Sequence, residues 1–244
     1  MDNKNNCIIC GAELEYFNSP KTMECELCHR IFQANAACKN GHYICDKCHS
    51  TNAVELIRSV CGSTKSKNPI EIMRKLMAQP AVHMHGPEHH ILVGSAIISA
   101  FHNCGGDVDL NAALDEMKNR GEQAPGGICG FWGCCGAAVS CGMAISIITG
   151  ATPLSGQEWG LANLMTSEAL ERIAAIGGPR CCKRDSFTAV SAAAEFIEEK
   201  FGIMLEMPEK IICGFYPMNG QCLGDRCPFH PKKAEDKQRR APFR

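Results

Sequence analysis

Residues 7–48 read CIICGAELEYFNSPKTMECELCHRIFQANAACKNGHYICDKC, and this stretch determines the fold expected for the N-terminal part of the chain. Two Cys-x2-Cys pairs are separated by fourteen residues and are followed by a Cys-x3-His motif and a third Cys-x2-Cys pair. Each pair places two sulfurs on one side of a tight turn, and two such units complete a tetrahedron around an ion. The spacing predicts two closed metal sites with eight ligands: Cys7, Cys10, Cys25, Cys28, Cys38, His42, Cys45 and Cys48.

The spacing leaves two ways of pairing these ligands. We favour a sequential pairing, with residues 7–28 around one ion and residues 38–48 around the other, because each set of four is complete within a short segment. The alternative is a cross-brace, in which the sets interleave as in RING-like modules. A Cys3His set favours zinc, whereas four thiolates also suit a rubredoxin-like iron. Closed sites offer no position to a substrate, so we expect two structural zinc ions, with His29 and His49 as supporting or surface residues.

The rest of the chain has apolar residues at helical spacing. Residues 1–50 hold seven cysteines but almost no apolar periodicity, so they need metal to fold. Helical patterns cover 53–60, 69–77, 88–101, 109–118, 137–149, 158–176 and 179–200. The predicted fold is mostly α, with a zinc-ribbon-like module over 1–50, a cysteine- and histidine-rich helical domain over 51–230, and a basic flexible tail over 231–244.

Charge and cysteine usage narrow the class of protein. The chain has 25 Lys and Arg against 26 Asp and Glu, and residues 1–50 hold five basic and six acidic residues. Nucleic acid needs clustered positive charge, so it is not an expected partner. The start, MDNKNNC, lacks the apolar core of a signal peptide, and the weakly polar stretch 137–150 is too short to span a bilayer. We therefore expect a cytoplasmic protein from an anaerobe, with eighteen reduced cysteines used for metal or redox chemistry.

A histidine cluster, His83-x-His85-Gly-Pro-Glu88-His89-His90, marks the start of the third helical pattern. Imidazole and carboxylate together suit zinc, iron or manganese, and the same pair can transfer protons. We predict that His85, Glu88 and His89 form a catalytic metal or proton-transfer site. The alternative is that these residues cap a helix and bond only to backbone.

Two adjacent cysteine pairs follow glycines where helices are expected to begin. Cys134-Cys135 ends the loop PGGICGFWGCC, and Cys181-Cys182 follows GGPR. A helix N-terminus favours thiolate, so we predict that the four sulfurs are catalytic. Arg180 and Arg184 are predicted to bind an anionic group of a substrate. Cys61 and Cys141 are interpreted as ordinary core residues.

The end of the chain carries a further motif, Cys213-x8-Cys222-x4-Cys227-Pro-Phe-His230. Three thiolates with a fourth ligand from His230 or from elsewhere suit an iron–sulfur cluster, and a structural zinc is the alternative. Cys129 is assigned to the same class of metal ligands. We expect the two cysteine pairs to meet around one polar pocket near the imidazoles of 83–90.

Four phrases also carry a resemblance: HMHGPEHHILVGSA (83–96), PGGICGFWGCCGAA (125–138), SIITGATPLS (146–155) and GGPRCCKRDS (177–186). Together they resemble an uncharacterised cysteine-rich domain family of archaea and anaerobic bacteria. Its members occur alone or joined to radical-SAM or other redox proteins. The resemblance spans about residues 7–230 and implies such a protein as a partner, but it implies no catalytic role for any residue.

Two classes of function remain open from sequence. One is a metal-dependent redox or sulfur-transfer enzyme or accessory protein, with an iron–sulfur cluster or other metal in the helical domain and a small or anionic substrate. The other is a zinc-binding adaptor that docks a protein partner without catalysis. Visible absorbance of the purified protein would separate the two, because only the first requires a coloured centre.

Overall fold

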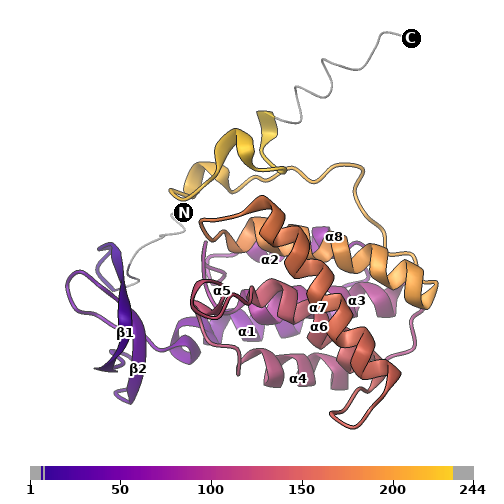
Figure 1. Cartoon of the computed structure of the whole chain (residues 1–244), viewed down its shortest axis with the longest axis horizontal. Coiled ribbons are helices and arrows are strands. Elements are labelled where there is room, and N and C mark those ends of the chain that lie inside the picture. The colour runs from indigo at the N-terminus through magenta and orange to yellow at the C-terminus, as the bar shows by residue number, and fades with distance from the viewer. Residues whose placement is uncertain (1–6, 8, 233–244) are drawn as a thin grey trace.

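A computed structural model describes residue 7 and residues 9–232, and it confirms the mostly α fold with a small N-terminal module. Figure 1 shows a two-stranded hairpin beside a bundle of helices, with the C-terminal segment lying across one end of the bundle. The elements are β1 (Leu14–Glu24), β2 (Ile31–Cys38), α1 (Asp46–Ser63), α2 (Pro69–Met77), α3 (His89–Asn103), α4 (Leu110–Gly121), α5 (Ile128–Phe131), α6 (Gly136–Thr149), α7 (Gln157–Ile176), α8 (Cys182–Phe201), and the 3₁₀ turns η1 (Tyr216–Met218) and η2 (Gly224–Arg226).

The N-terminal module is an antiparallel hairpin that covers almost no apolar core. Strand β1 pairs with β2 from Leu14 opposite Cys38 to Glu24 opposite Ile31, with an irregularity between Tyr16 and Lys21. Nearly every residue of β1 is exposed. The predicted need for metal agrees with this architecture, because burial of side chains alone cannot hold such a hairpin.

The helical domain is built around α3, which is buried on all sides. Helices α1, α2, α4, α6 and α8 all contact it, while α7 covers α6 and α8. A Cβ added at Gly94 would lie 2.9 Å from the carbonyl oxygen of Ser140, so the glycine lets α3 and α6 approach closely. Asn68 and Asp109 cap α2 and α4 through their side chains, as expected from their sequence positions.

The chain after α8 returns along the bundle without long regular elements. The backbone N–H of Glu206 donates to the carbonyl of Lys67, and Arg74 donates to the carbonyl of Ile212. These bonds fix residues 202–232 against the loops and the start of α8 (Figure 1). No helix in the described part of the chain has the length and apolar character needed to cross a bilayer. The predicted basic tail lies almost entirely outside the described residues.

Two helix starts differ from the sequence prediction. Helix α1 begins at Asp46, seven residues before the periodic pattern, because the third Cys-x2-Cys pair forms its first turn. Helix α8 begins at Cys182 rather than at Pro179, with Cys181 as its N-cap. The glycine-rich loop also contains the single turn α5, which the pattern did not predict.

Candidate metal centres

The structure interleaves the ligands of the N-terminal module, so the sequential pairing is wrong. The register of the hairpin explains the result: the first Cys-x2-Cys pair precedes β1 and therefore lies beside Cys38 at the end of β2. The turn between the strands meets the start of α1 at the other end of the hairpin. The two groups, each with ligand atoms within 4.8 Å of one another, are Cys7, Cys10, Cys38 and His42, and Cys25, Cys28, Cys45 and Cys48.

Distances within both groups match a tetrahedral ion. Zinc–sulfur bonds of about 2.3 Å require sulfur–sulfur edges of about 3.8 Å. Cys10 Sγ lies 3.9 Å from Cys38 Sγ, and Cys28 Sγ lies 3.8 Å from Cys45 Sγ. His42 Nδ1 lies 3.3 Å from Cys10 Sγ and 3.5 Å from Cys38 Sγ. Each group can therefore hold one metal ion such as zinc.

Backbone donors support the thiolate form of these ligands. Cys25 Sγ accepts the N–H of Cys45 at 3.3 Å, and Cys38 Sγ accepts the N–H of His42 at 3.3 Å. The backbone N–H of Ala12 is the main cause that lowers the pKa of Cys10 to about 6. Hydrogen bonds to a sulfur favour its charged form and prepare it for a cation.

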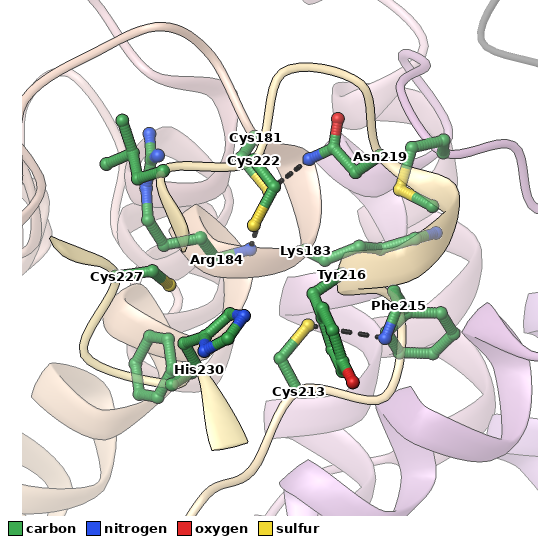
Figure 2. A pocket seen from close by; sticks show the side chains of 13 residues that line it. Cys181, Lys183, Arg184, Cys213, Phe215, Tyr216, Asn219, Cys222, Cys227 and His230 are labelled. Carbon is green, nitrogen blue, oxygen red and sulfur yellow. Dashed lines mark hydrogen bonds between the residues drawn. The ribbon is translucent and has the colours of Figure 1, made fainter. Parts of the chain in front are cut away.

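A second collection of thiols surrounds a small cavity at the start of α8. The C-terminal segment wraps over this end of the helix, and Figure 2 shows the side chains facing a common space. The fourth ligand sought for the C-terminal motif is thus available from Cys181, with His230 as a fifth candidate. The metal-ligating side chains that line the cavity are Cys181, Cys213, Cys222, Cys227 and His230.

Every one of these sulfurs has a backbone donor. Cys181 Sγ accepts the N–H of Arg184 at 3.5 Å, and it also accepts the side-chain amide of Asn219 at 3.3 Å. Cys213 Sγ accepts the N–H of Phe215 at 3.4 Å, and Cys222 Sγ accepts the N–H of Gly224 at 3.4 Å. Backbone N–H groups likewise act to lower the pKa of Cys227, although its burial outweighs them. This is the donor pattern of the N-terminal sites, repeated at a second place.

The spacing differs from that of the N-terminal sites. Among the described residues, no three of the five ligand atoms around this cavity lie within 4.8 Å of one another. The sulfurs are therefore too far apart to close a tetrahedron around a single ion without movement. The free space between them is about 10 Å³, so a larger group would also have to displace the C-terminal segment outward.

A larger pocket of about 250 Å³ lies between the hairpin and the helical domain. Tyr16 and His42 line it from the module, and His85, Cys129 and Cys182 line it from the domain. The guanidinium of Arg180 stacks over the Tyr16 ring at 5.1 Å from its centroid. This pocket has the size of a small-molecule site and presents a cation to its occupant.

Glu88, one of the predicted catalytic residues, is fully buried beside this pocket. Its Oε1 accepts the backbone N–H of His83 at 2.9 Å, while its Oε2 has no hydrogen-bond partner. Burial opposes ionisation, but the imidazoles of His83, His89 and His49 outweigh it and hold the pKa of Glu88 at about 2. A Cβ at Gly86 would fall 2.0 Å from Oε2, so only glycine leaves room for this carboxylate.

Predicted residues also connect the two cavities. His85 Nε2 lies 3.3 Å from Asn219 Oδ1, and the amide nitrogen of Asn219 donates to Cys181 Sγ. Lys183 donates to the carbonyl of His83 at 2.7 Å and to His89 Nε2 at 3.0 Å, and burial lowers its pKa to about 8. A hydrogen-bonded path therefore runs from the large pocket to a sulfur of the thiol cavity.

The two cysteine pairs do not meet around one pocket, which corrects the prediction. Cys181 lines the thiol cavity, whereas the adjacent Cys182 lines the large pocket beside Cys129. Consecutive residues at a helix start point in different directions, so each sulfur serves a different space. Cys134 lines neither cavity, and Cys135 caps α6.

Burial also overrides the helix dipole at these pairs. It raises the pKa of Cys135 to about 12 and that of Cys181 to about 11, and it raises the pKa of Cys182 as well. As free thiols they are thus protonated at neutral pH, contrary to the predicted thiolates, and a bound cation is needed to displace the proton. Arg184 also departs from its predicted role in binding a substrate anion. Its guanidinium is buried against Asp185 at 2.9 Å and is not open to a substrate.

The sequence did not place His49 with the histidine cluster. His49 was expected at a supporting or surface position, but α1 packs against α3 and the His49 ring lies 4.1 Å from that of His83. With Glu88 these residues form a third group of ligand atoms within 4.8 Å of one another. His49 and Glu88 are 39 positions apart and belong to two different predicted domains, so the spacing of residues could not reveal this group.

The fold and the sites define a helical protein with an N-terminal double metal-binding module. The chain belongs to a family of unknown function, DUF5714, whose model matches residues 57–230. This match confirms an uncharacterised domain, as expected from the four phrases; it begins within α1 and does not include the N-terminal module, which the resemblance was expected to span. No curated protein and no solved structure matches the chain.

Proposed function

We propose that this protein is a metal-dependent redox protein, in which two zinc ions fold the N-terminal module and an iron–sulfur cluster occupies the thiol cavity. The observation that carries the proposal is the convergence of four cysteines on one space, three from the C-terminal segment and one from the start of α8. Four thiolates are the usual ligands of such a cluster. The cluster would serve electron transfer to or from a substrate in the large pocket.

The surroundings of the cavity support a cluster over a single ion. The sulfurs are spaced more widely than those of the N-terminal sites, and a polynuclear cluster needs wider spacing than one zinc ion does. Hydrogen bonds to the sulfurs and the buried ammonium of Lys183 compensate for thiolate charge. Binding of the cluster would require the part of the C-terminal segment that lines the cavity, which has only short 3₁₀ turns, to shift outward.

The path through Asn219 supports a coupled function of the two cavities. His85 faces the large pocket, and Asn219 joins it to Cys181 through hydrogen bonds. A substrate that accepts an electron commonly takes up a proton as well, and the imidazole of His85 can relay one, gaining a proton at one ring nitrogen as it releases one from the other. A radical-SAM or other redox protein is the partner class we propose for supplying electrons.

The second candidate function is a zinc-binding adaptor. It is favoured by the N-terminal groups, whose distances fit closed structural sites that leave no position for a substrate. In that case the thiol cavity contracts around a third zinc ion. The two functions differ in colour, iron content and sulfide content.

Anaerobic purification followed by metal and acid-labile sulfide analysis tests the proposal. We expect two zinc ions and about four iron and four sulfide ions per chain, with visible absorbance that bleaches on reduction. Cys213→Ser removes iron and sulfide but leaves the two zinc ions. Cys104→Ser is the matched control, because this half-buried cysteine lies outside every ligand group. A colourless protein without sulfide, holding a zinc ion that Cys213→Ser removes from the thiol cavity, would instead establish the adaptor.

A further inference from the structure

We propose that His49, His83 and Glu88 form a third metal site, an open one that binds a divalent ion and presents it to an oxyanion-bearing substrate in the large pocket. The proposal does not depend on the iron–sulfur cluster. It assigns a mononuclear centre to residues from the end of the N-terminal module, from the loop before α3 and from the N-cap of α3.

The three ligand atoms have the spacing of a coordination shell. His83 Nδ1 lies 3.4 Å from Glu88 Oε1, and His49 Nδ1 lies 3.9 Å from Glu88 Oε2. Metal–nitrogen and metal–oxygen bonds of about 2.1 Å predict edges of about 3.4 Å in a tetrahedron. An ion placed between the two imidazoles and the carboxylate therefore reaches all three with a small adjustment of His49.

The same atoms lack any other partner. His49 Nδ1, His83 Nδ1 and Glu88 Oε2 are buried and make no hydrogen bond within the described chain. Glu88 is 0% exposed, and a buried carboxylate oxygen without a donor or a cation is strongly unfavourable. The nearby Lys183 is already engaged with the His83 carbonyl and His89. A cation bound between these atoms satisfies all three at once.

The surrounding structure holds the ligands in place. His49 follows Cys48 in the first turns of α1, so the second N-terminal metal group fixes its position. Lys183 anchors the backbone of His83, and the His83 N–H fixes Glu88 Oε1. The site therefore combines a ligand held beside the second N-terminal metal group with two ligands from the helical domain.

The ligand set leaves coordination positions open toward the pocket. Two histidines and one glutamate are typical of catalytic rather than structural zinc, because a fourth position remains for water or substrate. His49 and His83 line the large pocket, and Arg180 lines it as well. A metal ion and a guanidinium facing one space suit a substrate with a carboxylate or phosphate group, which can bind both.

Cobalt binding to the full chain, loaded with only two equivalents of zinc to fill the thiolate groups, tests the metal site. We expect one equivalent of Co2+ to bind beyond the occupied thiolate groups and to give weak visible bands without sulfur-to-cobalt charge transfer. Glu88→Gln keeps the shape and the bond to the His83 N–H, and we expect it to weaken this binding at least 10-fold. His29→Ala is the matched control, because His29 is exposed and pairs only with Glu24. Unchanged iron and sulfide contents in Glu88→Gln separate this result from the fate of the cluster.

The substrate class is tested on the cobalt-loaded protein with phosphate and with acetate. We expect at least one of the two anions to shift the visible bands, and the stronger one identifies the class. Arg180→Lys should weaken that anion about 10-fold while cobalt still binds, because the bidentate fork is lost. No additional cobalt in the wild-type chain, or equal binding by Glu88→Gln, overturns the metal site. Failure of both anions to shift the bands overturns the oxyanion assignment.

Discussion

Strand β1 of the N-terminal hairpin exposes nearly all of its residues, whereas α3 of the helical domain buries thirteen consecutive ones, His89–Phe101. The buried apolar residues in the described part of 7–45, which leaves out residue 8, are four cysteines and two alanines: Cys7, Cys25, Ala34, Ala37, Cys38 and Cys45. The helical domain instead buries a continuous cluster of aliphatic and aromatic side chains. We therefore expect one part of the molecule to depend on metal to fold, and the other to depend on burial of apolar surface.

Loss of a metal ligand in the N-terminal module should have the largest effect. In Cys45→Ser we expect one zinc ion fewer per chain and loss of structure over residues 9–48, because a structural zinc contributes roughly 10–16 kcal/mol. The helical signal in circular dichroism should persist, since α2 to α8 retain their core. Metal analysis measures the zinc content. Amide NMR spectra report the structure of the module separately from that of the helical domain.

Cys104→Ser again provides the control and should leave zinc content and amide spectra unchanged. The comparison fails if Cys45→Ser abolishes the helical signal together with the zinc. That outcome would mean that the hairpin and the bundle form one cooperative unit.

A smaller effect is predicted for the apolar core. Ile97 is fully buried in α3, so Ile97→Ala should lower the free energy of unfolding by about 2–5 kcal/mol through lost transfer energy and a cavity. Denaturant unfolding followed by circular dichroism measures the loss. Zinc content should stay the same because α3 carries no N-terminal ligand.

Ile31→Ala is the matched replacement in the module. Ile31 is 69% exposed at the start of β2, so the same change should have little effect on stability. A loss of similar size in both variants would show that the hairpin has an apolar core not evident from its exposure.

The same contrast explains what could be predicted from sequence. Local patterns identified all eight N-terminal ligands and the main helices, because ligand spacing and helical periodicity are short-range signals. The pairing of those ligands depended on the register of β1 against β2, which no motif encodes. Cys181 faces the same cavity as Cys213, Cys222 and Cys227 and lies 32 residues before Cys213. The direction of its side chain depends on helix α8 beginning at Cys182, which the local pattern did not predict.

The histidine cluster is a second site whose ligands could not all be found from local sequence patterns. Glu88 was predicted from its motif as a site residue and is buried beside the large pocket, whereas His49 was predicted to lie outside the site. Its ring lies near Glu88 because α1, which carries His49, packs against α3. A contact between such distant segments leaves no periodic signal in either one.

The smallest predicted effect concerns a helix cap in the helical domain. The carboxylate of Asp109 accepts the N–H of Ala112 at 3.1 Å at the start of α4, so Asp109→Ala should lower the free energy of unfolding by about 1 kcal/mol. Asp107→Ala is the control, because Asp107 is also exposed and precedes the cap. Thermal unfolding of the zinc-loaded protein measures both. Equal destabilisation by the two changes would assign the effect to net charge rather than to capping. A loss confined to Asp109→Ala, with the amide spectra of the module unchanged, would show that even small stability terms of the bundle leave the metal-folded part unaffected.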